Sequence, residues 1–158
     1  MSDLRDLYQE VILDHSRRPR NFGALDEANR AARGDNPLCG DRLVLAARVR
    51  GGKVEDLAFE GSGCAISVAS ASLMTEAVKG LPVVEVEALY RRFHRLLTSD
   101  APGDEPGDEP GELGKLEVFS GVREYPIRVK CATLAWHTLH AALERGGDDG
   151  GPVEVSTE

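Results

Sequence analysis

Residues 42–60 read RLVLAARVRGGKVEDLAFE, two apolar-rich runs on either side of a glycine pair. Gly51 and Gly52 form a two-residue turn readily, because glycine adopts the positive φ angles that tight hairpins need. Apolar and polar residues roughly alternate in the second run, which is typical of a strand with one buried face. The segment therefore predicts an antiparallel β-hairpin. A weaker run over residues 28–34 predicts a third strand.

Helical periodicity appears on both sides of this hairpin. Apolar residues recur three and four positions apart in several segments, and Pro126 favours the first turn of a final helix. Helices at both ends, with the strands grouped early, predict an α+β fold. We expect a small three-stranded antiparallel sheet packed against four to five helices. The expected helices cover residues 3–17, 64–79, 84–97, 113–121 and 126–145.

The acidic residues are unevenly distributed along the 158-residue chain, whose net charge is −8. Ten of the 27 acids lie in Asp100–Glu112 and Gly146–Glu158, which contain no Lys or Arg, leaving 17 acids against 19 bases elsewhere. The first stretch repeats Pro-Gly-Asp-Glu and has no side chains that build a core. We therefore expect one domain over residues 1–145, with a disordered acidic loop at about 100–112. Residues 146–158 are expected to be a disordered acidic tail.

Several classes of protein are disfavoured by composition. No segment approaches the roughly 18 consecutive apolar residues that a membrane span needs. Residues 1–6 lack a basic region followed by an apolar one, so we expect no secretory signal, no membrane partner and a cytoplasmic location. The basic residues form no dense run with interleaved aromatics, which predicts no nucleic-acid binding.

Three cysteines, Cys39, Cys64 and Cys131, make metal or thiol chemistry the leading question. An odd count closes no complete disulfide framework, although buried cysteines that act as small apolar residues are an alternative. Each cysteine lies at a boundary: before the hairpin, at the start of a helix, and in the first turns of the last helix. Asp41 points to the same side as Cys39 if that segment is extended. Three thiolates and one carboxylate fit tetrahedral zinc, and alternatively an iron–sulfur cluster.

Hydrolytic chemistry is less well supported by the same residues. A tetrahedral set made only of protein ligands leaves no open position for a water molecule, which disfavours a zinc hydrolase. A cysteine-nucleophile hydrolase is disfavoured too, since no histidine stands next to any cysteine in the sequence. We expect the four histidines to be packing or surface residues: His15, His94, His137 and His140.

Three motifs surround the cysteines: NPLCGDR at residues 36–42, FEGSGCAISVASAS at 59–72 and RVKCATLAW at 128–136. Together with the helix at residues 4–20, they resemble the ligand motifs and opening helix of the IscU/NifU-N iron–sulfur cluster assembly scaffold superfamily. The similarity covers roughly residues 4–145. It implies an IscU/NifU-N-like fold.

Two features resemble the SufU branch more than the IscU branch. Lys130 precedes the third cysteine where IscU-type scaffolds have histidine, and the 67-residue separation of Cys64 and Cys131 is longer than theirs. The chaperone-recognition motif Leu-Pro-Pro-Val-Lys is also replaced, by YPIRVK at residues 125–130. The resemblance implies a zinc-dependent sulfurtransferase. Such a protein accepts persulfide sulfur from a SufS-type cysteine desulfurase and passes it to a SufBCD-type complex.

The resemblance also implies a role for individual residues. Cys39, Asp41, Cys64 and Cys131 would be the zinc ligands, and Cys39 would be the sulfur acceptor. Arg128 would position a partner carboxylate or the incoming sulfur, and a solvated surface arginine is the alternative. Two alternatives stay open: a scaffold that assembles a [2Fe–2S] cluster on the same four residues, and a structural zinc module for protein interaction with no reactive thiol.

Overall fold

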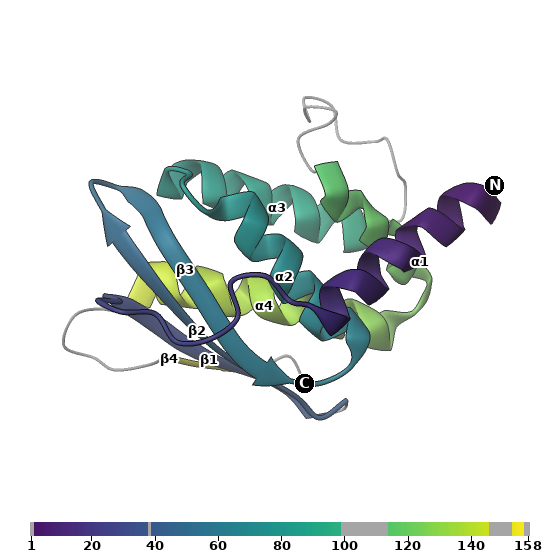
Figure 1. Ribbon diagram of the computed structural model, residues 1–158, viewed down its shortest axis with the longest axis horizontal. Coiled ribbons are helices and arrows are strands. Elements are labelled where there is room, and N and C mark those ends of the chain that lie inside the picture. Colours follow the sequence, from purple (N-terminus) through teal and green to yellow (C-terminus); the bar gives the residue numbers. More distant parts are fainter. Residues whose placement is uncertain (1, 38, 99–113, 146–152, 157–158) are drawn as a thin grey trace.

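The computed structural model describes residues 2–37, 39–98, 114–145 and 153–156. Helices gather on one side of a twisted sheet (Figure 1). The acidic loop expected at about 100–112 lies outside the described residues. In chain order the elements are α1 (Ser2–Arg17), β1 (Arg30–Asn36), β2 (Asp41–Arg50), β3 (Lys53–Ser62), α2 (Ala65–Val78), α3 (Val83–Thr98), the 3-10 helix η1 (Gly114–Glu124), α4 (Pro126–Arg145) and β4 (Val153–Ser156).

The strands form one sheet in the order β3-β2-β1-β4. The predicted hairpin and third strand are confirmed, because β1, β2 and β3 pair antiparallel. Gly51 and Gly52 have φ angles of 61° and 75°, as the turn requires. The α+β prediction is likewise confirmed, with the expected helices on the sheet.

The fourth strand is a correction to the expected disordered tail. Val153–Ser156 pairs parallel with β1, with Val153 opposite Ala32, so the prediction for residues 146–158 is wrong over these four positions. Valine alternates with glutamate and serine here, and valine favours strands. The outer edge of β1 also presents backbone groups that need partners. This pairing extends the three-stranded antiparallel sheet by one short strand.

Alternation along the strands turns one face of the sheet toward the core. Every second residue of β2 from Asp41 to Ala47 is buried, while Arg42 and Val44 are exposed. β1 follows the same rule up to its last residue, Asn36. Two polar side chains, Asp41 and Asn36, therefore lie on the core-facing side at one end of the sheet.

Helix α4 packs on β1 and β2 and also contacts α2, which in turn packs on α1. A glycine allows this close approach, since a Cβ at position 34 would clash with Thr138 and Leu134 of α4. On the other side of α2, the Nδ1 atom of buried His15 lies 2.7 Å from Ser72 Oγ. These contacts hold α2 and α4 against the end of the sheet that carries Asn36 and Asp41.

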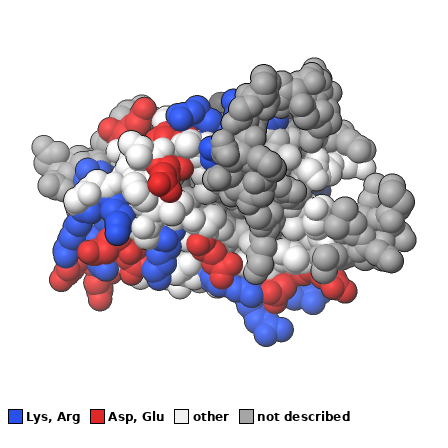
Figure 2. All heavy atoms as spheres, turned by 90° about the horizontal axis from the view of Figure 1, so that it is seen from above, with Lys and Arg blue, Asp and Glu red and all other residues white. Residues whose placement is uncertain are grey.

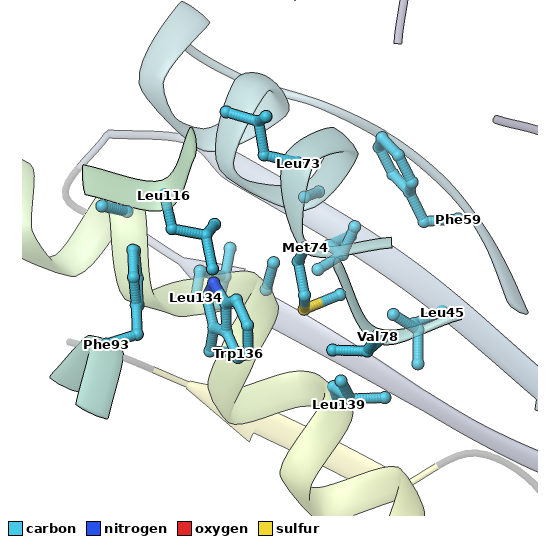
Figure 3. Close-up of a cluster of buried hydrophobic side chains, with 14 of the residues drawn as sticks. Leu45, Phe59, Leu73, Met74, Val78, Phe93, Leu116, Leu134, Trp136 and Leu139 are labelled. Carbon is cyan, nitrogen blue, oxygen red and sulfur yellow. The ribbon is translucent and has the colours of Figure 1, made fainter. Parts of the chain in front are cut away.

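An aromatic group fixes α4 from its other flank (Figure 3). Trp136 stacks on Phe93 of α3 with ring centroids 5.0 Å apart, and Phe119 of η1 meets Phe93 edge-on at 5.9 Å. All three side chains are almost fully buried. Burial of a large apolar side chain contributes roughly 1.5–3 kcal/mol, so this group sets the position of α4 and with it Cys131.

The described surface is strongly charged but mixed in sign. Figure 2 shows basic and acidic side chains beside one another on the face seen from above. At the hairpin, Arg48 Nε lies 2.6 Å from Glu55 Oε1, and Arg50 Nη2 lies 3.2 Å from Glu27 Oε1. None of the described helices is long and apolar enough to cross a membrane.

Candidate metal centre

Three side chains with metal-binding atoms meet where the β1–β2 turn reaches α4. The ligand atoms of Cys39, Asp41 and Cys131 all lie within 4.8 Å of one another. Cys131 is fully buried and Asp41 is 1% exposed, whereas Cys39 is half-buried. No other such group occurs among the described residues. The site is therefore a buried pocket of donors with one more accessible thiol.

Cys39 lies in a turn rather than in an extended segment. The backbone N–H of Cys39 donates to the carbonyl of Asn36 at 3.2 Å, and Pro37 occupies the second turn position, which it favours. Gly40 follows with φ of 72°, a left-handed conformation suited to glycine. The extended backbone that would align Cys39 with Asp41 is therefore not present. The turn brings the two side chains together instead.

Asp41 is a buried carboxylate with a donor on each oxygen. The backbone N–H of Cys64 donates to Oδ1 at 2.9 Å, and Asn36 Nδ2 donates to Oδ2 at 3.2 Å. The first donor lies at the N-terminus of α2, where the helix dipole favours negative charge. These bonds satisfy a carboxylate that would otherwise be costly to bury.

Gly63 allows Asp41 to lie this close to the start of α2. A Cβ at position 63 would fall well inside contact distance of Asp41 Oδ1. A glycine at position 63, directly before Cys64, is thus needed for Asp41 to reach the start of α2.

Cys64 caps α2 and lies beside the group of three. Its Sγ accepts a hydrogen bond from the backbone N–H of Ser67 at 3.4 Å, in the manner of an N-cap residue. Cys64 also contributes to the raised pKa of Cys131, which places the two thiols near each other. The structure therefore groups three of the four predicted ligands, and Cys64 lies beside them with its sulfur engaged by its own helix.

Cys131 is the most deeply placed thiol. Burial raises the pKa of Cys131 well above its usual range, and hydrogen bonds to Cys39, Asp41 and Cys64 raise it further. Its Sγ lies 3.2 Å from Cys39 Sγ and 3.4 Å from Asn36 Nδ2. Several acidic groups crowded in a buried space compete for negative charge, and a bound cation relieves that competition by replacing thiol protons.

Arg128 lies on the exposed side of the same site, one turn before Cys131 on α4. A hydrogen bond to Cys131 raises the pKa of Arg128, and the charges of Cys64, Cys131 and Cys39 add to this effect. Nearby cations favour thiolate over thiol. Arg128 therefore supplies positive charge at the point where solvent reaches the sulfurs.

The donor set fits a small thiophilic cation. Sulfur ligands are soft and suit zinc or iron–sulfur clusters, and the site groups two cysteines and one aspartate with a third cysteine, Cys64, beside them. The remaining histidines lie elsewhere: His94, His137 and His140 surround Tyr90 between α3 and α4. Asn36 is a site residue to which the motif alone assigned no role.

The fold and the site define a class of small α+β proteins with a cysteine–aspartate cluster between the sheet end, α2 and α4. The model of the NifU-like N-terminal domain family matches residues 7–145. The chain belongs to this family of iron–sulfur cluster assembly scaffolds.

Two curated relatives span nearly the whole chain. It is 41% identical over 149 residues to the zinc-dependent sulfurtransferase SufU of Bacillus subtilis strain 168, covering 93% of this chain and 97% of that protein. It is 40% identical to the iron–sulfur cluster assembly scaffold protein IscU of Streptococcus pyogenes serotype M1, covering 94% and 89%. A solved structure, the N-terminal part of a nitrogen-fixing NifU-like protein from Brucella abortus, is similar at a TM-score of 0.76 and 27% identity, covering 87% and 92%.

Proposed function

We propose that this chain is a zinc-dependent sulfur carrier in iron–sulfur cluster assembly. In this proposal Cys39 accepts sulfur from the persulfide of a SufS-type cysteine desulfurase, and the sulfur then passes to a SufBCD-type complex. The observation that carries the proposal is the placement of the three grouped side chains: Asp41 and Cys131 are buried, whereas Cys39 lies on a half-exposed turn. The similarity to the Bacillus zinc-dependent sulfurtransferase supports the same activity.

Cys39, Asp41, Cys64 and Cys131 would hold the metal. Zinc keeps its cysteine ligands deprotonated at neutral pH and has no redox chemistry of its own. The buried residues Asp41 and Cys131 serve as the fixed part of the site. The backbone bond from Cys39 to Asn36 closes the turn without using the Cys39 side chain.

The transfer step needs only the Cys39 thiolate and the persulfide of the partner. Cys39 Sγ attacks the outer sulfur of that persulfide, and a new S–S bond forms on Cys39. The S–S bond within the desulfurase persulfide breaks, and the partner cysteine leaves as a thiolate. One sulfur atom moves at unchanged oxidation state, so no external oxidant or reductant is needed.

Arg128 serves this step as a cation at the entrance. Its guanidinium faces the sulfurs from the exposed side, where an incoming persulfide anion arrives. A fixed positive charge there stabilises both the attacking thiolate and the departing one.

The test measures alanine formation by a SufS-type desulfurase with and without this protein. Wild type should stimulate turnover strongly, Cys39→Ser should give none, and Arg128→Gln should stimulate less. Arg91→Gln, an exposed arginine of α3 at a different site, is the matched control and should behave as wild type. Full stimulation by zinc-loaded Cys39→Ser would refute the proposal.

A second candidate is a scaffold that assembles a [2Fe–2S] cluster on the same residues. The name of the Streptococcus relative, at nearly equal identity, favours it. Metal analysis and an absorption spectrum after anaerobic purification separate the two. Zinc at about one ion per chain with no visible absorption supports the carrier, whereas sulfide-to-iron absorption bands support the scaffold.

A further inference from the structure

Asn36 is a fully buried polar residue next to the proposed metal ligands. It is the last residue of β1, faces the core like the alternate residues before it, and lies directly opposite Asp41 in the antiparallel register. An apolar residue here would continue the core, so a buried asparagine needs a compensating role. Its hydrogen bonds indicate what that role is.

The side-chain amide of Asn36 connects two of the grouped residues. Nδ2 donates to Asp41 Oδ2 at 3.2 Å and to Cys131 Sγ at 3.4 Å, so both of its hydrogens are directed at the site. Oδ1 has no hydrogen-bond partner among the described residues. The opposite amide orientation would place Oδ1 against a carboxylate and a sulfur, both of them acceptors. Asn36 therefore acts as a donor to the site, and its side-chain oxygen is left without a hydrogen bond among the described residues.

The side-chain amide of Asn36 bonds two of the three grouped side chains and not the third. Asp41 and Cys131 are both held by its amide, whereas Cys39 receives only a backbone contact from it, through the Asn36 carbonyl. Among the described residues, the Cys39 sulfur is bonded only to the Cys131 thiol. Hydrogen bonds from outer residues fix the orientation of metal ligands and strengthen metal binding.

We propose that Asn36 is a positioning residue that secures Asp41 and Cys131 as the permanent ligands and so leaves Cys39 as the ligand that is released. This inference rests on the proposed function, because it explains why one thiol of the site is the sulfur acceptor. It assigns that selectivity to a single buried amide.

The first measurement is zinc affinity, determined by competition with a chromophoric chelator. Asn36→Leu has a similar shape and no donor, so its affinity should fall roughly 10- to 100-fold. The cobalt-substituted protein should show shifted thiolate-to-cobalt and d–d bands, which a general loss of stability does not produce. Asn29→Leu is the matched control, since Asn29 also makes two side-chain hydrogen bonds, to the backbone of Val49, away from the site. It should lose stability and keep zinc affinity.

The second measurement is the site of alkylation in zinc-loaded protein. Limiting iodoacetamide followed by peptide mapping should label Cys39 ahead of Cys131 in wild type. In Asn36→Leu the ratio of Cys131 to Cys39 labelling should rise. If Asn36→Leu does not fold, Asn36→Ser, which retains one donor, is tested in its place. Zinc affinity should again fall, and the ratio of Cys131 to Cys39 labelling should again rise.

Wild-type zinc affinity, or an unchanged labelling ratio, in the variant that folds would overturn the role of Asn36. The proposed function is tested independently of Asn36: it is refuted if Cys39 of the wild-type protein gains no sulfur from the desulfurase.

Discussion

The backbone N–H of Cys64 donates to Oδ1 of Asp41 at 2.9 Å, across 23 positions of sequence. This bond joins the first residue of β2 to the N-cap of α2. A helix N-terminus favours a nearby anion, and the buried carboxylate in turn neutralises the helix end. Two of the proposed ligands are thus fixed relative to each other by the fold itself.

Replacing Gly63 by alanine should disturb this relationship. The added Cβ would collide with Asp41 Oδ1, so Gly63→Ala should lower the free energy of unfolding by about 1–3 kcal/mol and weaken zinc binding. Gly121→Ala is the control, because a Cβ there meets no atom within 4 Å. Its effect should stay within about 0.5 kcal/mol in urea unfolding. Equal stability and equal zinc content in the two variants would contradict the close approach.

Cys64→Ser and Cys131→Ser should each remove most of the stabilisation that zinc gives. A metal present at 100 times its Kd adds about 2.7 kcal/mol to the free energy of unfolding. Each variant removes one thiolate that ties a helix to the site, so most of that increment should disappear. Thermal unfolding with and without added zinc measures it. A normal zinc-dependent rise in Tm in either variant would show that its cysteine is not a ligand.

The main elements of the fold were predictable because their signals are local. The Gly51-Gly52 turn with its flanking alternation, and the apolar spacing of α2 and α3, need only neighbouring residues. β4 was missed because four residues after an acidic segment carry little periodicity, and their pairing depends on a free edge of β1 far away in the chain. Strand pairing of this kind is decided by tertiary context.

The candidate site was predictable only in part. Its motifs identified Cys39, Asp41, Cys64 and Cys131, but their separation says nothing about distance until the fold is known. Asn36 carried no signal of its own because its bond to Cys131 spans 95 positions. The turn at Cys39 was also missed, although Pro37 and Gly40 on either side of it favour a turn over a strand.

Stability should fall in mild acid because of His137. Burial lowers the pKa of His137 below 6.5, and the charges of His94 and His140 lower it further. The unfolded state then binds more protons than the folded state between the lowered pKa of His137 and its ordinary value of 6.5, so the free energy of unfolding falls as the pH drops through this interval. His137→Gln removes this protonation and keeps a polar partner for Tyr90 OH, which lies 2.8 Å from His137 Nδ1. Urea unfolding of the metal-free protein should show a flatter pH dependence in the variant. An identical slope in both proteins would assign the effect to other groups.

Removal of residues 146–158 should expose one edge of β1. The paired residues of β1 are Ala32–Asp35, so backbone amides bonded to β4 should exchange faster with deuterium in the truncated protein. The antiparallel β2–β3 pairs supply an internal control whose protection should not change. Unaltered exchange throughout β1 would argue against the fourth strand in solution.

The central claim is that Cys39 receives the sulfur while Asp41 serves only the metal. Zinc-loaded wild type, Asp41→Ala and Cys39→Ser are incubated with a SufS-type desulfurase and cysteine, then alkylated without reductant and analysed by peptide mass spectrometry. Wild type should carry one additional sulfur atom on the Cys39 peptide. With excess zinc present, a smaller fraction of Asp41→Ala should carry the same addition. Cys39→Ser should carry none, because a hydroxyl does not attack a persulfide sulfur at neutral pH. An additional sulfur on Cys64 or Cys131, or on any peptide of Cys39→Ser, would contradict the account.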